Sequence, residues 1–546
     1  MSLLGSAFTG TGRLVRLALR RDRIQLPIWL VGLTLTQAAT VSSVVGLYPT
    51  EQERVAVAIS TAQSPVGVMF NGLVSGTSVG ATVITQSFMV VAMAAAFMST
   101  LCVVRHTRQN EETGRAEMIG AGIVGRHALL TAALVVAVGA NVVLGLLNAA
   151  VLIANDLPTG GSLAAGAGIA SVGIAFAAIA AVTAQVSETS RGANGMAAAA
   201  IGVAFLLRGI GDVAGKVVDG GVTLVSAWPS WLSPIGWGQQ IRPFDRDNWW
   251  VLGLLVVAFA ALVGLAFELT AHRDLGAGLR AVRPGRPTAS SGLLSPLGLA
   301  WRLQRGVLIG WAIGIVVLGA AYGGVGDEIE DFVGDSEQLA EYFEKVGGTG
   351  RLTDVYFAAT LSITGLAVAG YAIQTLLRMR AEEASGRLEP VLATSVGRTR
   401  WMWSHIAIAT LGTVLLLVLM GASTGIGYGA VVGDVGDQVS NLTRAALVQA
   451  PAVLALSGLA VVAFGLLPRL AVALSWTALA LCVLIGQLGE LFGLPQAVVN
   501  LSPFTHLPGA PAAEVTALPL LVLLLVALAF TAFGMTSFRR RDLAPS

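Results

Sequence analysis

Twelve apolar segments of roughly 20 residues dominate the sequence and restrict what the chain can fold into. A helix of that length is long enough to cross the hydrocarbon core of a bilayer. Charged residues make up only 12% of the chain, about half the share in an ordinary soluble domain. We therefore predict an all-α integral membrane protein with 12 transmembrane helices. The segments cover about 26–47, 82–104, 128–155, 162–187, 194–211, 248–270, 306–325, 355–377, 405–430, 446–467, 470–489 and 516–537.

The distribution of arginine predicts how these helices are oriented. Arginines precede the first segment, follow the twelfth and cluster after segments 2, 6, 8 and 10, whereas the alternate loops are acidic or weakly charged. Because cytoplasmic loops are enriched in Arg and Lys, both termini are expected to be cytoplasmic. The first segment is too long for the apolar region of a signal peptide. Abundant Gly, Ala and Arg with very few Lys are typical of a high-GC bacterium, so we expect a bacterial cell (inner or plasma) membrane.

One polar stretch occurs twice, about half a chain length apart. Residues 108–126 read RQNEETGRAEMIGAGIVGR and residues 380–398 read RAEEASGRLEPVLATSVGR. The matched positions are Arg108 and Arg380, Glu111 and Glu383, Gly114 and Gly386, Arg115 and Arg387, Glu117 and Glu389, and Arg126 and Arg398. A second echo, Arg273-Asp274-Leu275 and Arg541-Asp542-Leu543, follows segments 6 and 12. These matches indicate a tandem duplication.

The duplication predicts the domain organisation. Each half contains six segments, and an even number makes the halves parallel repeats related by an axis along the membrane normal. We expect a first six-span domain at 1–275, a cytoplasmic linker at 276–294 and a second six-span domain at 295–546.

Four segments outside the spans have recognisable patterns. Basic and apolar residues alternate at helical spacing in 12–24, and 297–305 is the counterpart in the second half. Both favour a helix that lies in the cytoplasmic interface over a flank that only sets the topology. The outer segment 213–247 is too apolar for a free loop and too rich in Pro and Gly for a span, which predicts a short re-entrant helix or a folded loop anchored by Trp. Residues 327–346 predict an amphipathic helix with an acidic solvent face, and a metal cluster there is the less favoured interpretation.

The sequence contains no recognisable motor or catalytic centre. The stretch GIGDVAGKV at 209–217 has the wrong glycine spacing for a P-loop and a Val where Ser or Thr binds magnesium. The five histidines lack the spacing of metal ligands. We expect no metal and no bound cofactor in this chain. If ATP drives it, a separate subunit hydrolyses the nucleotide.

The duplicated stretch is the strongest candidate for a functional site. If it is helical, Glu111 with Arg115 and Glu383 with Arg387 form i,i+4 pairs worth about 0.2–0.5 kcal/mol each. Stability is therefore a weak reason for the pattern to occur twice, and docking on another protein is a better one. The alternative is that the arginines occur only because cytoplasmic loops are enriched in Arg and Lys. That enrichment does not require matched Glu and Gly.

The pattern E-x-x-G-x-x-E ahead of the third span resembles the cytoplasmic loop of ABC-2 type exporter permeases. The fused twelve-span form is most similar to the actinobacterial permeases grouped with tetronasin and other polyketide antibiotic exporters. That resemblance implies elbow helices, cytoplasmic coupling helices, re-entrant outer helices and two copies of a separate ATPase that binds ATP and Mg. The residues implied in ATPase coupling are Arg108, Glu111, Gly114, Arg115, Glu117, Arg126, Arg380, Glu383, Gly386, Arg387, Glu389 and Arg398.

The resemblance also implies export of hydrophobic or amphipathic small molecules, such as drugs, antibiotics or lipids, through a central cavity. Spans 1, 2 and 5 of one half and 7, 8 and 11 of the other would line it. The apolar candidates are Phe88, Met89, Phe97, Met98, Phe205, Phe357, Tyr371 and Trp476, although each is also compatible with ordinary helix packing.

Two other classes of protein remain open. A proton-coupled secondary transporter of the major facilitator type also has six plus six spans, but it normally carries acids inside its spans, and here Glu268 and Glu490 lie near span ends. A membrane enzyme needs a cluster of acids and donors, and only 327–346 offers one. No nucleic-acid partner is expected.

Overall fold

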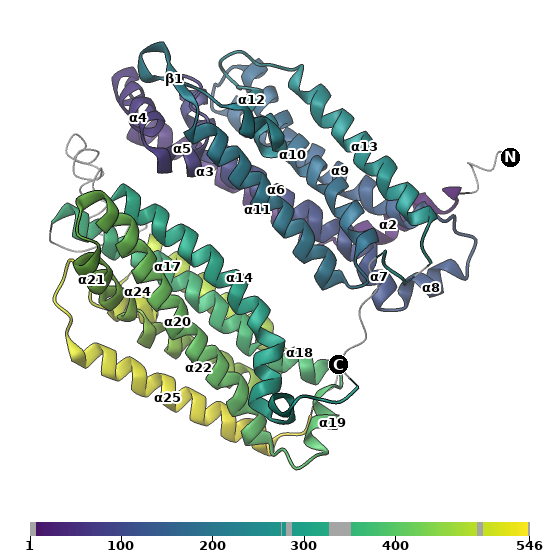
Figure 1. Cartoon of the computed structure of the whole chain (residues 1–546), viewed down its shortest axis with the longest axis vertical. Helices are drawn as coiled ribbons and strands as arrows, with labels where there is room; N and C mark the ends of the chain where they lie inside the picture. The colour runs from purple at the N-terminus through teal and green to yellow at the C-terminus, as the bar shows by residue number, and fades with distance from the viewer. Residues whose placement is uncertain (1–6, 275, 280–286, 327–350, 489–494, 544–546) are drawn as a thin grey trace. The chain divides into compact units, whose positions relative to one another are not determined.

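The computed structural model describes residues 7–274, 276–279, 287–326, 351–488 and 495–543. The chain divides into two compact units, Met1–Pro284 and Gly285–Ser546 (Figure 1). Each unit has its own hydrophobic core. The predicted amphipathic helix at 327–346 lies outside the described residues.

The first unit is built almost entirely of helices. Its elements are α2 (Thr11–Arg21), α3 (Gln25–Leu47), α4 (Glu51–Gln63), α5 (Pro65–Asn71), α6 (Val79–His106), α7 (Arg108–Glu112), α8 (Arg115–Gly120), α9 (Ala128–Ala154), α10 (Thr159–Val186), α11 (Ser190–Val213), β1 (Lys216–Val218), η1 (Asp219–Gly221), β2 (Thr223–Val225), η2 (Trp228–Leu232), α12 (Pro234–Gln240) and α13 (Val251–Ala271).

The second unit repeats the order of long helices. Its described elements are η3 (Ser291–Leu294), α14 (Pro296–Val325), α17 (Leu352–Leu376), α18 (Arg378–Ala384), α19 (Leu388–Leu392), α20 (Arg398–Val432), α21 (Val435–Leu447), α22 (Ala450–Leu466), α23 (Ala471–Leu488), α24 (Gln496–Val499), η4 (Pro503–His506) and α25 (Ala517–Arg540).

Among the described residues, 11 helices are long and apolar enough to cross a membrane. A shorter apolar helix, Ala471–Gly486, lies where the segment 470–489 predicts a further span. These helices are hydrophobic around their whole circumference, which is typical of helices that face lipid or neighbouring spans. The predicted fold class, an all-α integral membrane protein, is therefore confirmed.

The helices differ in how deeply they are buried within their own unit. In the most apolar windows of α6 and α10, 72% and 78% of the residues are buried, whereas only 22% are buried in α3 and 17% in α13. The core of the first unit therefore lies around α6, α9 and α10, and α3 and α13 form its exposed sides. The second unit repeats this arrangement, with α17 deeply buried and α14 and α25 exposed.

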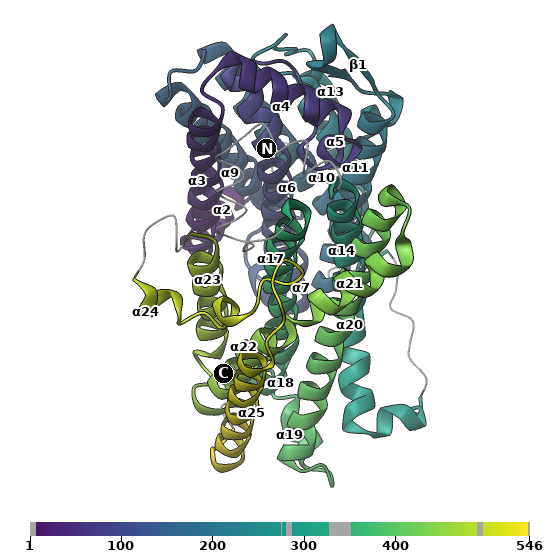
Figure 2. The ribbon, with the colours of Figure 1, turned by 90° about the vertical axis from the view of Figure 1, so that its left-hand side faces the viewer.

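The segment 213–247 contains a small sheet that was not predicted from the sequence. Strands β1 and β2 pair antiparallel, with Lys216 opposite Val225. This hairpin and α4 lie together at one end of the first unit (Figure 2). The short apolar helix α12 follows, and the Ser233 hydroxyl caps it by accepting from the backbone of Ile235 and Gly236. Ser502 caps η4 at the matching place in the second unit.

The two predicted elbow helices fold differently. In the first unit, α2 ends at Arg21 and a break at Asp22–Ile24 separates it from α3. In the second unit, the counterpart 297–305 is the first part of α14, which continues as one helix to Val325. A separate elbow helix is therefore present only in the first half of the described chain.

Candidate functional site

Each copy of the duplicated stretch folds into two short helices separated by a tight turn. The turn between α7 and α8 contains Gly114, and the turn between α18 and α19 contains Gly386. Both glycines have a φ of 71°, in the left-handed region. Only glycine adopts that backbone at little cost because it has no Cβ. The repeated glycine is therefore a requirement of the repeated turn.

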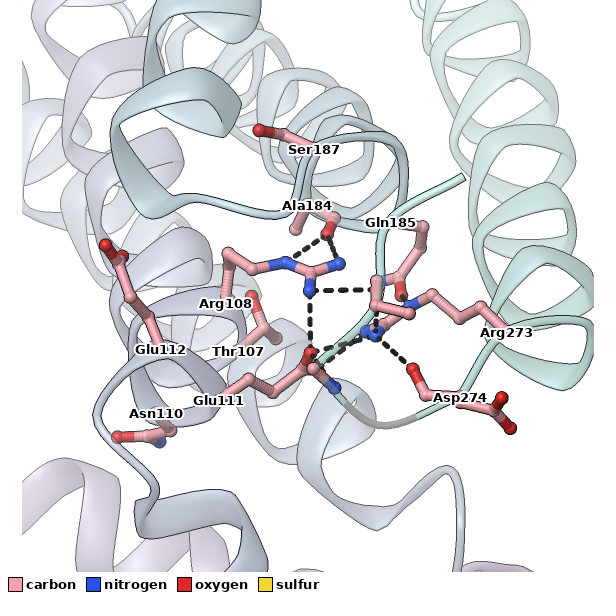
Figure 3. Close-up of polar contacts among 12 residues, drawn as sticks. Thr107, Arg108, Asn110, Glu111, Glu112, Ala184, Gln185, Ser187, Arg273 and Asp274 are labelled. Carbon is pink, nitrogen blue, oxygen red and sulfur yellow. Dashed lines mark hydrogen bonds and ion pairs between the residues drawn. The ribbon is translucent and has the colours of Figure 1, made fainter. Parts of the chain in front are cut away.

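Glu111 of α7 is held by an arginine that follows the last helix of the unit (Figure 3). Arg273 donates from Nη1 to Glu111 Oε2 at 2.8 Å and from Nη2 to Oε1 at 2.6 Å. Its Nε donates to Gln185 Oε1 at 2.7 Å, at the end of α10. A two-pronged guanidinium–carboxylate bond fixes orientation as well as distance. Arg273 thus ties the duplicated stretch to the ends of α10 and α13.

Arg108 strengthens the same cluster from the other side. Its side chain is fully buried, and its Nη1 donates to Glu111 Oε2 at 2.8 Å. Its Nε and Nη2 both donate to the carbonyl oxygen of Ala184, at 2.8 and 2.6 Å. That carbonyl lies in the last turn of α10, where a cation offsets the negative end of the helix dipole.

The second unit repeats the pair between carboxylate and arginine. Arg541 donates from Nη1 to Glu383 Oε1 at 2.6 Å and from Nη2 to Oε2 at 2.9 Å. Its Nε donates to the carbonyl of Gly465 at 3.1 Å, at the end of α22. Arg380 completes the match with Arg108, because its Nη1 lies 3.7 Å from Glu383 Oε2. We call the pairs Glu111–Arg273 and Glu383–Arg541 the two clamps.

A second matched arginine reinforces each clamp. Arg126 donates to the carbonyls of Thr270 and Arg273, both at 3.1 Å. Arg398 donates to the carbonyls of Phe538 and Arg541, at 3.3 and 2.5 Å. Both arginines thus bind the C-terminal carbonyls after the last long helix of their unit, which would otherwise lack partners.

The clamps were not predicted from the sequence, although both of their components were identified there. Glu111 was matched with Glu383 and, separately, Arg273-Asp274-Leu275 with Arg541-Asp542-Leu543. Both motifs recur in the second half at nearly the same separation from each other, and that recurrence indicates that their residues are in contact.

The predicted i,i+4 pairs do not form in the described structure. Such a pair needs a continuous helix between its members, and the turns at Gly114 and Gly386 interrupt it. Glu111 pairs with Arg108 and Arg273, and Glu383 pairs with Arg380 and Arg541. The prediction of Glu111–Arg115 and Glu383–Arg387 pairs was wrong for this reason.

Four other charged residues of the duplicated stretch face solvent. They are Arg115, Glu117, Arg387 and Glu389, on α8 and at the start of α19. Met118 and Ile123 are 71% and 92% exposed in the first copy, which is unusual for large apolar side chains outside a membrane span. Each copy therefore combines an inner face fixed to its own unit with an outer face that is free of such contacts.

The elbow helix α2 is joined to the same region by a buried carboxylate. Asp22 accepts from Arg105 Nη1 at 2.7 Å and lies 2.6 Å from His106 Nε2. Burial by itself raises the pKa of Asp22, but the hydrogen bond and charge of His106 and the charge of Arg105 outweigh it and hold that pKa below its ordinary value. Arg21 donates to Asn110 Oδ1 at 2.7 Å, so α2 also contacts α7.

Asp22, Cys102 and His106 place three potential metal-ligand atoms within 4.8 Å of one another. Asp22 Oδ1 accepts from Arg105, and Oδ2 already lies 2.6 Å from His106 Nε2. The guanidinium of Arg105 would repel a second cation bound to the same carboxylate. We interpret the cluster as an ion-pair network that holds α2 against α6. At the matched position of the second unit, Gln304 contacts α20 instead, with its Nε2 2.7 Å from His405 Nδ1.

The end of the first unit that contains α4 and the hairpin also contains a buried ion pair. Arg208 and Asp212 of α11 are fully buried, with 3.3 Å between Nη1 and Oδ2. Arg208 also donates to the carbonyls of Val68, at 3.0 Å, and of Met69. The pair thus fixes α5 against the C-terminal end of α11.

The predicted cavity residues divide into two groups. Phe88, Met89, Met98, Phe357 and Tyr371 are buried in the hydrophobic core of their own unit. Phe97 and Trp476 are exposed, at 36% and 42%, and Phe205 is partly buried between Phe70 and Arg208. The first group thus packs in the core of its unit, and a role of any of these residues in a cavity stays a prediction.

Comparison with known proteins identifies the family. The family described as the C-terminal domain of the multidrug efflux system permease Rv1217c matches residues 12–269 and 293–539, which cover most of both units. The chain is also 41% identical over 539 residues to the multidrug efflux system permease protein Rv1217c of Mycobacterium tuberculosis (strain ATCC 25618 / H37Rv). That similarity covers 98% of this chain and 96% of the relative.

The chain belongs to the Rv1217c family of multidrug efflux permeases. Membership of the Rv1217c family makes it a multi-pass membrane transport subunit and not an enzyme. It also gives no support to the major facilitator alternative. The clamps and the exposed faces of α8 and α19 are therefore features of a permease.

Proposed function

We propose that this chain is the membrane subunit of an ATP-driven ABC-2 type exporter, in the fused twelve-span form similar to the polyketide antibiotic exporters of actinobacteria. In this proposal the segment 470–489 counts as a span, and the two units are parallel six-span repeats with both termini in the cytoplasm. The chain lies in the bacterial cell membrane and moves hydrophobic or amphipathic drugs or antibiotics out of the cell.

One observation carries the proposal: the same clamp occurs in both units. Glu111–Arg273 and Glu383–Arg541 each fasten the duplicated stretch to the end of the last long helix. A clamp of this kind transmits force from a bound partner to the spans, because a two-pronged ion pair resists rotation as well as separation. Two equivalent clamps suit two copies of one partner, and we assign that partner as a separate ATPase that binds ATP and Mg.

The exposed residues are assigned the contact with the ATPase. Glu117 and Glu389 occupy matched positions on α8 and α19, and both side chains face solvent. ATP-driven closure of the two ATPase copies would push on α8 and α19, and the clamps would pass that motion to α13 and α25. As a result, the cavity that holds the cargo would switch between inward and outward access.

A charge reversal tests the contact with the ATPase. The double variant Glu117→Lys with Glu389→Lys is expected to insert and unfold like the wild type, because both side chains are exposed, but to lose co-purification with the ATPase and efflux. Glu268→Lys is the matched control, since Glu268 is exposed on α13 outside the duplicated stretch. If the double variant keeps both ATPase binding and efflux, the assigned contact is wrong.

The energy source needs a separate test. Dye efflux from cells that express the permease and the ATPase should persist when an ionophore collapses the proton gradient, and should stop when ATP is depleted. Loss of efflux with the gradient alone would instead indicate proton coupling and would overturn the ATP-driven assignment.

A further inference from the structure

An apolar pocket of about 490 Å³ lies in the first unit, between α9, α10 and α13. Its floor consists of small buried residues, Gly145 and Ala149 of α9 and Gly166 and Ala170 of α10. Its walls consist of larger residues, among them Leu146, Trp249 and Val256, which are about half exposed. A pocket of this volume falls in the roughly 300–1,000 Å³ range of ligand sites.

The pocket results from where the glycines of this unit lie. A Cβ on Gly145 or on Gly166 would collide with the backbone of the other, so α9 and α10 are in direct backbone contact there. Helix α13 packs beside them with large side chains, and only Val251, Leu255 and Ala266 of it are buried. The space above the two glycines is left open.

The second unit uses its glycines at a different interface. There Gly465 of α22 meets Gly534 of α25, and Gly458 meets Ala527, so the last helix lies directly against α22. The corresponding pair in the first unit is α10 and α13, which has no such glycine contact along the pocket. The pocket is therefore built by a local difference between two otherwise matched units.

The lining specifies a hydrocarbon ligand. Ser171 has the only side-chain hydroxyl in the lining, and its Oγ already donates to the carbonyl of Gly168 at 2.8 Å. A ligand group with its own donors or acceptors would lose hydrogen bonds on entering such a site, whereas an alkyl chain would lose none. The pocket therefore excludes polar groups and accepts methylenes.

The depth of the pocket in the membrane indicates from which leaflet the alkyl chain enters. Its residues extend from the C-terminal part of α9 and the N-terminal parts of α10 and α13 to the middle of α9 and α10, at Val142 and Ile174. The arginine pattern assigns these terminal parts to the outer face. Trp249 lines the rim, next to Trp250, which stacks on Trp231, and tryptophans of this kind occur at the headgroup level. The exposed Arg246 lies three residues before Trp249 and suits a lipid phosphate.

We propose that this pocket is a binding site for one acyl chain of an outer-leaflet phospholipid. The acyl chain lies over Gly145 and Gly166, and the phospholipid headgroup lies at the level of Trp249. The site is distinct from the coupling site, because none of its lining residues belongs to the duplicated stretch or to either clamp. The bound acyl chain takes the place of the side-chain contacts that α13 and α9 do not make at the pocket.

Photochemical labelling tests the site directly. The full-length permease is reconstituted in phospholipid nanodiscs with a trace of phosphatidylglycerol that carries a diazirine on its acyl chain, and labelled peptides are mapped by mass spectrometry after irradiation. We expect severalfold more label on residues 142–149 and 252–259 than on the exposed apolar face of α3, around Ile28 and Val31. Equal labelling of pocket and reference surfaces would overturn the proposal.

A filled-pocket variant and its matched control sharpen the test. Ala167→Phe places a ring in the pocket, and Ala260→Phe places the same ring on the exposed face of α13 outside the lining. Displacing two or three methylenes of a bound acyl chain is expected to lower pocket labelling by roughly 15- to 60-fold in Ala167→Phe, with no change in Ala260→Phe. If both variants label like the wild type, the proposal fails. If Ala167→Phe does not fold, the wild-type map still decides.

A competition arm separates lipid from efflux cargo. Saturating rhodamine 6G, a hydrophobic cationic dye, should leave the labelling of the pocket unchanged, because the site binds lipid. Displacement of the diazirine lipid by the dye would instead make the pocket a cargo site and would overturn the assignment to lipid. This outcome is independent of whether an ATPase drives the permease.

Discussion

Arg273 and Glu111 meet through two hydrogen bonds of 2.8 and 2.6 Å, although 162 residues separate them in sequence. Arg541 and Glu383 meet in the same way in the second unit, at 2.6 and 2.9 Å. In each case the carboxylate belongs to the duplicated stretch and the arginine follows the last long helix. The duplication is therefore preserved as a tertiary contact as well as a sequence pattern.

Glu111→Gln is expected to destabilise the first unit. Both side chains of the clamp are less than a tenth exposed, so neutralising Glu111 removes the carboxylate that the buried Arg273 and Arg108 share. The cost of breaking a buried pair is about 3–5 kcal/mol. Thermal unfolding in detergent should show a clearly lowered midpoint, whereas the matched change Glu117→Gln at an exposed position should leave it unchanged. An unaltered midpoint in Glu111→Gln would mean that the clamp contributes no stability.

Gly114→Ala and Gly386→Ala are expected to have nearly equal effects. An added Cβ meets nothing within 4 Å at either position, so the cost comes only from the left-handed backbone, about 1–2 kcal/mol. Asn, which tolerates this backbone better, should cost less. Gly120→Ala also meets nothing within 4 Å but has no positive φ, and it should be neutral or stabilising. Denaturant unfolding of the variants measures the costs, and equal stability of all of them would contradict the assigned turn.

Arg208→Met is expected to destabilise the end of the first unit that contains α5 and the C-terminus of α11. The substitution removes the cation that pairs with the buried carboxylate of Asp212, and breaking such a pair costs about 3–5 kcal/mol. The double variant Arg208→Met with Asp212→Leu should recover part of that loss, because it removes both charges. Unfolding midpoints of the two single variants and the double variant give the coupling energy. Additive losses would show that the two residues act independently.

Asp22→Asn is expected to make stability less dependent on acidic pH. The folded pKa of Asp22 lies below its unfolded value, so its contribution is fully present above about pH 4 and is lost as the pH falls through the folded pKa. The difference in unfolding midpoint between wild type and Asp22→Asn should therefore shrink with acidification. Asp274→Asn, which alters an exposed carboxylate, should show no such trend. A constant difference across the acidic range would exclude the assigned ion pair.

Hydrophobic length and periodicity predicted the long helices closely, because membrane spans are determined by local composition. The segment 26–47, for example, forms α3 at Gln25–Leu47. The turn glycines were also predictable as matched positions. The span at 470–489 is represented by a shorter apolar helix in the described chain.

Contacts between distant residues were not predictable in the same way. The i,i+4 pairs failed because the pattern does not reveal that Gly114 takes a positive φ and ends the helix. The hairpin of β1 and β2 was missed because each strand has only three residues. The buried state of Arg108 was hidden because an arginine at a cytoplasmic loop is normally interpreted as a topological signal.

The different entry helices of the two halves have a mechanical consequence. Helix α14 runs unbroken for 30 residues, about 45 Å, so a displacement at its first turn reaches its far end as the movement of a rigid rod. The corresponding chain of the first half bends at Asp22–Ile24, and its joint is held by charges. The same force applied to both halves would therefore displace their helices by different distances, and the two halves of the transporter would not open at the same time.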